Sequence, residues 1–286
     1  MTEKSSECDS CAQKGSCKDE KDVRAGGECD HKVDRMARVK HKIIIASGKG
    51  GVGKSTVTVN LARALQMKGF KVGVLDADIT GPDIAKLLGI EEGRLMQGQD
   101  GILPVEADGI RAASMAFLLS SRDSPVVWRG PMKMAAIKQF IQDVDWGDLD
   151  FLLIDLPPGT SDEPLSVVQL IPELAGAIIV TTPQEVALLD SRKAVNMVRA
   201  MKIPVLGIVE NMSGLICPHC GESISIFGAG GGERMAREMD ERFLGAVPMD
   251  PSVSALGDSG KTFVQSQASA AASFNQIVER LIEMFR

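Results

Sequence analysis

Residues 47–56 of the chain read S-G-K-G-G-V-G-K-S-T and contain the pattern G-x-x-x-x-G-K-[S/T]. The apolar stretch K-I-I-I-A at 42–46 precedes them, and a helical pattern of apolar residues follows. A strand, a glycine-rich turn and a helix in this order bind phosphates, because the glycines let backbone N–H groups turn toward an anion at the helix N-terminus. In such a loop Lys54 reaches the β- and γ-phosphates and the Ser55 hydroxyl binds Mg²⁺. The stretch therefore predicts an α/β fold with a nucleotide-binding P-loop.

The composition limits what kind of protein this is. The chain has 286 residues, of which 44% are hydrophobic and only 4% aromatic, so its core must consist largely of aliphatic side chains. A net charge of −6 argues against a broad nucleic-acid interface, which needs a basic face. No apolar run approaches the roughly 18 residues of a membrane span, and the polar N-terminal segment lacks the apolar core of a signal peptide. We therefore expect a cytoplasmic protein that binds neither nucleic acid nor membranes.

Residues 1–38 form a cysteine-rich segment distinct from a P-loop ATPase domain at 39–286. The segment is polar, so we expect it to be disordered unless it binds a metal. Its spacing C-x2-C-x5-C suits thiolate ligation of zinc, Cu(I) or an iron–sulfur cluster, with Cys29 or, as a weaker candidate, His31 as a further ligand. The four candidate ligands are Cys8, Cys11, Cys17 and Cys29.

Acidic residues follow two of the predicted strands. The strand at 71–75 ends in D-A-D, which places Asp76 and Asp78 at its carboxyl end. The apolar strand within D-F-L-L-I-D-L-P-P-G-T, residues 150–160, ends at Asp155. Ligands of open α/β sheets bind at the carboxyl ends of the strands, and an acid in this position supports Mg²⁺ through water in P-loop NTPases. Asp155 is therefore the expected second half of the nucleotide site.

The remaining pattern predicts a mainly parallel sheet covered by helices on both faces, because strands and helices alternate. Further strands are expected at 177–181, 205–209 and 244–247, with a helix at 184–201 between the first two. Residues 90–130 are expected to leave this pattern as an excursion, with a β-hairpin formed by 102–106 and 110–114. A final amphipathic helix carries one apolar stripe and balanced charges, which favours docking on the core. Asn211 follows the strand at 205–209 and so is placed at the ligand-binding edge, although a turn role is equally compatible with the sequence.

A second cysteine motif, C-P-H-C-G, begins at Cys217 and includes Cys220. One C-x-x-C supplies only two ligands and cannot close a tetrahedral site, whereas two copies across a symmetric dimer supply four thiolates. A redox motif is the alternative, but these cysteines do not open a helix in a thioredoxin-like unit. The stretch G-A-G-G-G at 228–232 has the wrong spacing for a dinucleotide fingerprint and is expected to be a flexible turn before a helix at 233–239.

These motifs together resemble a known superfamily. G-K-G-G-V-G-K-S-T, with a second lysine at Lys49, is similar to the deviant Walker A motif of the MinD/ParA-like ATPases. Within that group the chain resembles the Mrp/ApbC-type ATPases over residues 36–286, and its tail resembles that of the eukaryotic cytosolic scaffold member, except that no cysteine precedes Cys8. The matching stretches are L-D-A-D-I-T-G-P-D, I-D-L-P-P-G-T-S-D-E, T-T-P-Q-E-V-A-L-L-D, V-E-N-M-S and C-P-H-C-G.

The resemblance implies a role for each site residue. Lys49 would cross a dimer interface to the partner's nucleotide, Asp78 would orient the attacking water, and Asn211 would contact adenine. Asp155 would support Mg²⁺. Cys217 and Cys220 would share a bridging 4Fe–4S cluster with the same residues of a second subunit. The residues that would bind phosphates and Mg²⁺ are Gly48, Gly50, Gly51, Val52, Gly53, Lys54, Ser55 and Thr56.

The resemblance further implies a homodimeric ATPase that uses ATP and Mg²⁺ to assemble or carry iron–sulfur clusters and passes them to apoproteins. A hetero-oligomer with a paralogue is a variant of this interpretation. Two other classes share the P-loop: a MinD/ParA-like positioning or partitioning ATPase, which needs no cysteines, and a reductase like the nitrogenase iron protein. Zinc suits a site of four thiolates as well as a cluster does.

Overall fold

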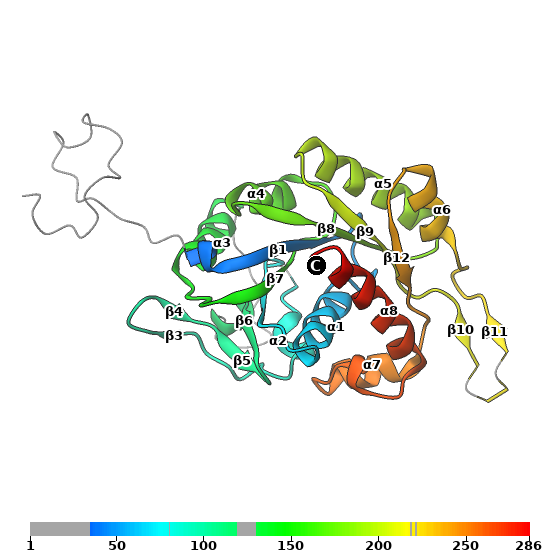
Figure 1. Cartoon of the computed structure of the whole chain (residues 1–286), viewed down its shortest axis with the longest axis horizontal. Coiled ribbons are helices and arrows are strands. Elements are labelled where there is room, and N and C mark those ends of the chain that lie inside the picture. The colour runs from blue at the N-terminus through cyan, green and yellow to red at the C-terminus, as the bar shows by residue number, and fades with distance from the viewer. Residues whose placement is uncertain (1–34, 80, 119–129, 218, 221) are drawn as a thin grey trace, which may run out of the picture. The chain divides into compact units, whose positions relative to one another are not determined.

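The structure, a computed structural model, describes residues 35–79, 81–118, 130–217, 219–220 and 222–286. The described residues contain one eight-stranded sheet (Figure 1). All neighbouring strands in it are parallel except β5 and β6, which are antiparallel. Across the sheet the strands are β12 (Phe243–Ala246), β9 (Val205–Glu210), β8 (Leu174–Thr181), β1 (Val39–Ala46), β7 (Leu149–Asp155), β2 (Val72–Asp76), β6 (Ile110–Ala113) and β5 (Val105–Ala107).

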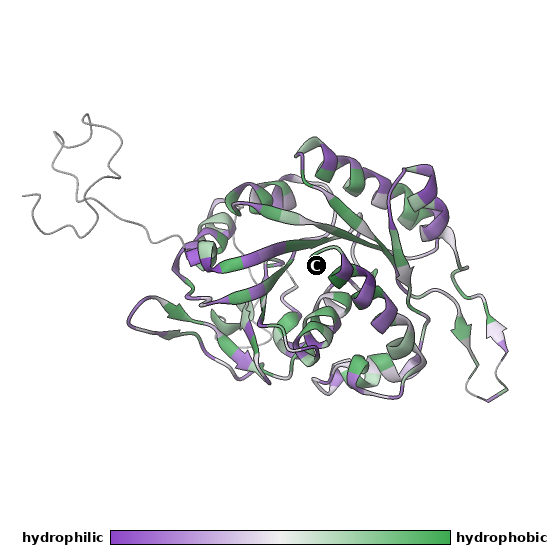
Figure 2. Ribbon diagram, viewed as in Figure 1, coloured by the Kyte–Doolittle hydropathy of each residue, from purple (hydrophilic) through white to green (hydrophobic). Residues whose placement is uncertain are grey.

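Helices cover both faces of the sheet, as the sequence predicts. The central strands are rich in buried apolar residues, and Ile43, Ile44 and Ile45 of β1 are fully buried, alternating between the two cores. Figure 2 shows hydrophobic residues concentrated along the strands. One face packs against α1 (Lys54–Met67), α2 (Ile84–Leu87), α7 (Pro251–Asp258) and α8 (Ser269–Glu283). The other packs against α3 (Gly130–Asp143), α4 (Asp162–Leu170), α5 (Glu185–Ala200) and α6 (Gly231–Glu238).

Residues 90–130 are expected to leave the alternating pattern, but part of this region belongs to the main sheet. The predicted hairpin exists as β5 and β6, but β6 also pairs in parallel with β2. Ile110, Ala112 and Ala113 of β6 are fully buried, so pairing with β2 removes apolar surface from water and covers an edge that β2 would otherwise expose. Residues 102 and 103 do not belong to the hairpin. They form β4 (Ile102–Leu103), which pairs with β3 (Met96–Gln97) in a separate two-stranded sheet.

The C-terminal helix confirms its predicted apolar stripe, because Phe274, Ile277, Val278 and Leu281 are all buried. The remaining described elements are short: the strands β10 (Leu215–Ile216) and β11 (Ser223–Ile224), and the 3₁₀ turns Arg35–Arg38, Met115–Leu118 and Phe263–Gln265. None of the helices in the described ranges is long and apolar enough to cross a bilayer. The tail at 1–34 lies outside the described residues, so its predicted disorder and ligand set stay predictions.

Asp250 joins the first turns of two helices. It is the N-cap of α7, and one carboxylate oxygen accepts hydrogen bonds from the Ser252 N–H at 2.9 Å and the Ser252 hydroxyl at 2.6 Å. The other oxygen accepts from the N–H and the hydroxyl of Ser269, at the start of α8, both at 2.8 Å. Burial alone would raise the pKa of Asp250, but these hydrogen bonds outweigh it and lower the pKa to about 2 from 3.8.

Asp250→Ala should therefore reduce stability at neutral pH by about 1–2 kcal/mol, the usual value of such a cap. Because the folded-state pKa is depressed, this contribution is complete above the unfolded value of 3.8 and is lost as the pH falls toward about 2. Urea unfolding at about pH 7 and about pH 3 should thus show a smaller difference between wild type and variant at the lower pH. Asp258→Ala, at the exposed other end of α7, is the matched control and should change stability little. A difference that is independent of pH would contradict the assignment.

Candidate nucleotide site and cysteine arm

The loop between β1 and α1 curls around the N-terminus of α1, and two of its glycines are required by close contacts. A Cβ atom on Gly48 would lie 2.1 Å from the backbone carbon of Asp190 in α5. Gly53, the N-cap of α1, has φ 83°, and a Cβ there would lie 2.2 Å from Nδ2 of Asn211. These two glycines therefore let the loop pass close to α5 and to Asn211, so that its backbone can curl around the helix N-terminus, where anions bind.

The two predicted halves of the site meet at Asp155. Its Oδ2 accepts hydrogen bonds from the Lys54 ammonium at 2.6 Å and from the Ser55 hydroxyl at 2.7 Å, and its Oδ1 accepts from the Thr58 hydroxyl at 2.7 Å. Asp155 is completely buried and Lys54 nearly so. The structure thus brings Lys54, Ser55 and Asp155 together, as the sequence predicts. Thr58 was not among the predicted residues, although its position one turn after Lys54 places it on the same helix face.

Asp76 is a buried acid that the sequence analysis placed at the sheet edge without assigning it to the site. It is the register partner of Asp155 in the neighbouring strand and accepts a hydrogen bond from the Ser114 hydroxyl at 2.9 Å. Burial, and then the nearby charge of Asp155, raise the pKa of Asp76 well above its ordinary value. Burial also raises the pKa of Asp83, followed by the effects of Asp78 and Asp155. The carboxylates therefore create a negative field that a cation would relieve.

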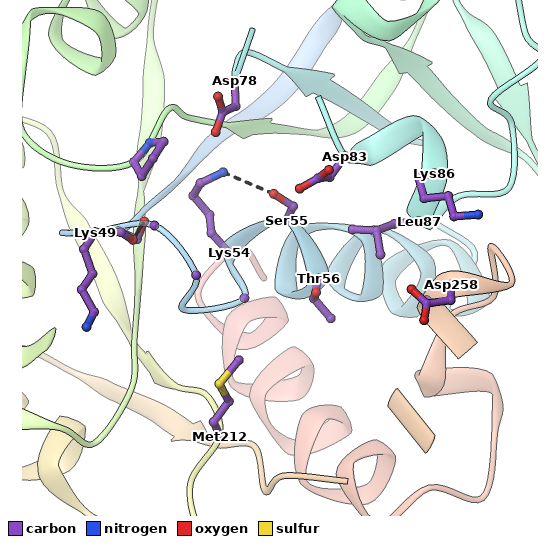
Figure 3. Close-up of a pocket in the computed structure, with 16 residues that line it drawn as sticks. Lys49, Lys54, Ser55, Thr56, Asp78, Asp83, Lys86, Leu87, Met212 and Asp258 are labelled. Atoms are coloured by element: carbon purple, nitrogen blue, oxygen red, sulfur yellow. Dashed lines mark hydrogen bonds between the residues drawn. The ribbon is translucent and has the colours of Figure 1, made fainter. Parts of the chain in front are cut away.

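The residues present fit Mg²⁺ bound together with a nucleotide. Among the described residues no group of three or more His, Cys, Asp or Glu side chains is placed to hold an ion by itself. Mg²⁺ commonly binds through substrate phosphates and only one or two protein groups, so a dedicated cage is not needed. In Figure 3, Ser55 faces Asp83 and lies across the same space from Asp78, beside Lys54. These side chains surround a cavity of about 410 Å³.

A second cavity adjoins the first and is more apolar. Its volume is about 440 Å³, and Gly53, Thr56 and Met212 line both it and the first cavity. Its other walls include Asn211, Leu215 and residues 247–251. A polar end beside the P-loop and an apolar end beyond it match a nucleoside triphosphate, with its phosphates in the first cavity and its base in the second. We call them the phosphate cavity and the base cavity.

Asn211 lines the second cavity next to Gly53, a residue that lines both cavities. Its side-chain Nδ2 donates a hydrogen bond to the Val52 carbonyl at 3.0 Å, and its own N–H donates to the Thr181 carbonyl at 2.8 Å. Met212, which follows it, has φ 57°, a conformation uncommon for a residue with a side chain. The structure therefore brings Asn211 to the P-loop, while its expected contact with adenine stays a prediction.

Lys49 differs from the other predicted site residues. Figure 3 shows its ammonium group directed away from Lys54 and Ser55. It makes no hydrogen bond or ion pair with another described residue, although its carbonyl accepts from the Ser47 hydroxyl at 3.0 Å. Lys54 points into the phosphate cavity while Lys49 points out of it, so the two lysines are not equivalent.

Cys217 and Cys220 lie at the tip of a hairpin that the sequence analysis did not predict. β10 and β11 pair in antiparallel fashion, and the Cys217 N–H donates to the Glu222 carbonyl at 2.9 Å. We call residues 213–230 the cysteine arm; in Figure 1 its strands extend away from the body of the domain. Both thiols are free, and Cys220 is exposed. Hydrogen bonds from the backbone of Cys220 and His219 lower the pKa of the Cys217 thiol, which favours the thiolate that binds metals.

The comparisons with known proteins agree with this geometry. A model of the ParA family, described as NUBPL iron-transfer P-loop NTPase, matches residues 38–282. The chain belongs to this family. It is 50% identical over 285 residues, 99% of this chain and 98% of the relative, to the iron-sulfur cluster carrier protein of Methanocaldococcus jannaschii. It is 48% identical to the cytosolic Fe-S cluster assembly factor NUBP2 homolog of Nematostella vectensis, with 86% of this chain and 94% of the relative covered.

Solved structures support the same fold. The chain is 42% identical to a nucleotide-binding protein of Archaeoglobus fulgidus solved with ADP, with a TM-score of 0.72 over 80% of this chain and 89% of that one. The septum site-determining protein MinD of Pyrococcus horikoshii, at 24% identity, has a TM-score of 0.64 over 86% of this chain and 97% of that one. The second likeness concerns the fold alone, and together the two confirm the predicted MinD-like P-loop NTPase architecture.

Lys54→Ala should weaken the binding of Mg-ATP by about tenfold to a hundredfold, since a hydrogen bond to a charged group contributes about 1.5–3 kcal/mol. It should also lower the melting temperature, because buried Asp155 would lose its cation. Titration with a fluorescent ATP analogue and a melting curve measure the two effects. Lys193→Ala removes an exposed lysine from α5 and should change neither. An unchanged nucleotide affinity in folded Lys54→Ala would remove Lys54 from the site.

Proposed function

We propose that the protein is an ATP-hydrolysing carrier of iron–sulfur clusters. The observation that carries this proposal is the presence of a complete P-loop site and a protruding pair of cysteines in one chain of an iron-transfer NTPase family. The relatives named as cluster carriers and assembly factors support it. The cluster is the cargo in this proposal, recipient apoproteins are the partners, and the location is the cytosol.

In the nucleotide site, Lys54 and the amides of the P-loop hold the β- and γ-phosphates of ATP. Ser55 would be the protein ligand of Mg²⁺, which would neutralise phosphate charge, and Asp155, which accepts the hydrogen bond of the Ser55 hydroxyl, would support the metal. Asp78 orients the water that attacks the γ-phosphorus, so that the bond to the bridging oxygen breaks and ADP and phosphate form. Asn211 contacts the base in the second cavity.

A second copy of the chain would complete two features that one copy leaves incomplete. The outward Lys49 would reach the partner's phosphates, and the two thiolates of each arm would combine into a four-thiolate site. A two-fold axis places identical patches against each other, so both features follow from one homodimer, or from a pseudo-symmetric dimer with a paralogue. The 4Fe–4S cluster would then bridge the arms at an exposed tip, where an apoprotein can reach it. A second cluster would bind Cys8, Cys11, Cys17 and Cys29 of the tail.

Lys49→Ala should retain ATP binding but lose hydrolysis by about a thousandfold, the effect of a positive charge supplied by a partner in other P-loop enzymes. Phosphate release and equilibrium binding separate the two parameters. A mixture of Lys49→Ala and Lys54→Ala chains then tests the cross-subunit role. In the mixed dimer, the Lys49→Ala chain binds ATP and receives Lys49 from its partner, so activity should reappear. No recovery in a mixture shown to contain mixed dimers would contradict this role.

Cys217→Ala with Cys220→Ala should abolish the bridging cluster. Because the tail has its own cysteines, the comparison is best made in full-length chains that also carry Cys→Ala at Cys8, Cys11, Cys17 and Cys29. After anaerobic reconstitution with iron and sulfide, the chain with an intact arm should hold about four iron atoms per dimer, with a cluster absorption spectrum. The arm variant should hold none, and His219→Ala should match the intact arm. Equal iron in both chains would disprove the bridging site, and zinc without a cluster spectrum would change the identity of the cargo.

A further inference from the structure

Both ends of the cysteine arm meet at one buried carboxylate. Glu210, the last residue of β9, has no exposed surface. Its Oε1 accepts a hydrogen bond from the hydroxyl of Ser213, where the arm begins, at 2.5 Å, and from the N–H of Gly230, where the arm ends, at 2.8 Å. Its Oε2 accepts from the N–H of Gly232. Ser213 and Gly230 are far apart along the chain, so the carboxylate closes the base of the arm.

The structure also moves the predicted boundary between the turn at G-A-G-G-G and the helix after it, because the helix begins at Gly231 and not at residue 233. Gly230 is the N-cap of α6, and Gly231 and Gly232 form its first turn. A Cβ atom on Gly232 would lie 3.0 Å from both Cβ and Oε2 of Glu210, which leaves little room for a larger side chain. The glycines therefore allow the N–H groups at the start of α6 to reach a carboxylate on the neighbouring strand, and this charge is favourable at a helix N-terminus.

The segment from Glu210 into the arm is at the same time a wall of the base cavity. Met212 and Leu215 line that cavity. The Ser213 N–H donates to the Val247 carbonyl at 2.9 Å, and the Met249 N–H donates to the Gly214 carbonyl at 2.7 Å. Leu215 also forms a bridge with Met249. Cys217 follows Leu215 by two positions in the sequence, so the first strand of the arm starts from the nucleotide site itself.

A helix cap alone does not account for Glu210. Capping α6 requires only the contacts to Gly230 and Gly232, whereas the contact with Ser213 ties the opposite end of the arm to the same group. Asp250 shows that this chain also uses a partly exposed acid as a cap. Placing an acid at a fully buried position is costly unless all of its partners are present, so its value here lies in fixing three segments together.

We propose that Glu210 is a positioning residue of the cluster site. It fixes the base of the arm, so that Cys217 and Cys220 keep a defined place relative to the base cavity and a nucleotide in that cavity restricts their motion. The purpose of this positioning rests on the proposed function, but the positioning itself does not require bound iron.

The test measures the arm directly in the full-length protein without iron or a bound cluster. Cys217 and Cys220 are alkylated with iodoacetamide with and without Mg-ADP, and each site is followed by peptide mass spectrometry, which separates the arm from the tail cysteines. In the wild type, Mg-ADP should slow alkylation of the partly exposed Cys217 by about tenfold, equivalent to about 1.4 kcal/mol of restricted opening, whereas the exposed Cys220 serves as the internal reference. In Glu210→Gln the nucleotide-free rate should rise and the effect of Mg-ADP should disappear, while ADP affinity stays within about threefold of wild type.

Two further variants keep the result decisive. Ser213→Ala removes only the contact between Glu210 and the start of the arm and leaves the cap of α6 intact, so positioning predicts a smaller change in the same direction and capping alone predicts none. Glu238→Gln makes the same charge change in an exposed ion pair of α6 and should behave as wild type. Wild-type alkylation and nucleotide response in folded Glu210→Gln would overturn the proposal. If Glu210→Gln does not fold, wild-type alkylation and nucleotide response in Ser213→Ala would overturn the proposal instead. A wild type that binds no cluster but shows the predicted alkylation pattern would disprove the cargo and leave the positioning role intact.

Discussion

The buried ion pair between Lys54 and Asp155 is the interaction on which the nucleotide site depends. It joins the start of α1 to the end of β7 across the centre of the sheet, and both groups are nearly or fully removed from solvent. An unpaired charge at this position would cost several kcal/mol, so the loop and the strand must keep their relative position. The same carboxylate also accepts the hydrogen bond of the Ser55 hydroxyl, so one buried acid holds both P-loop side chains in place.

Acids at the ends of three parallel strands are accommodated in three different ways. Asp155 in β7 pairs with Lys54, and Glu210 in β9 accepts N–H groups from the start of α6. Asp76 in β2 pairs with no cation among the described residues, and its raised pKa follows from burial beside Asp155. The charged form of Asp76 is therefore costly in this buried place, and a cation that enters with the nucleotide would stabilise it. The same edge of the sheet thus carries two different sites: Asp76 lies where a cation can bind, and Glu210 fixes the base of the cysteine arm.

The sequence predicts those parts of the molecule whose physical causes are local. The P-loop, Asp155 at its strand end and the alternation of strands and helices depend on spacing within short windows, and the structure confirms them. Glu210 could not be identified from the sequence, because its partners Gly230 and Gly232 lie about twenty residues further on. Only the packing of α6 beside β9 brings them together. The pairing of β6 with β2 is missed for the same reason, since only the sheet shows which edge was open.

Lys49 and the two arm cysteines each form only part of a site within one chain, which links ATP hydrolysis and cluster binding to dimer formation. Lys49 has no partner of opposite charge among the described residues, and Cys217 and Cys220 provide half of a tetrahedral thiolate set. Neither feature gains stability for a single chain, because a free lysine and an exposed thiol pair contribute little to folding. In the proposed dimer, each would be completed by the same symmetry operation. Because the arm begins at the wall of the base cavity and is fixed at Glu210, ATP and the arms of both subunits would then respond to one closing motion.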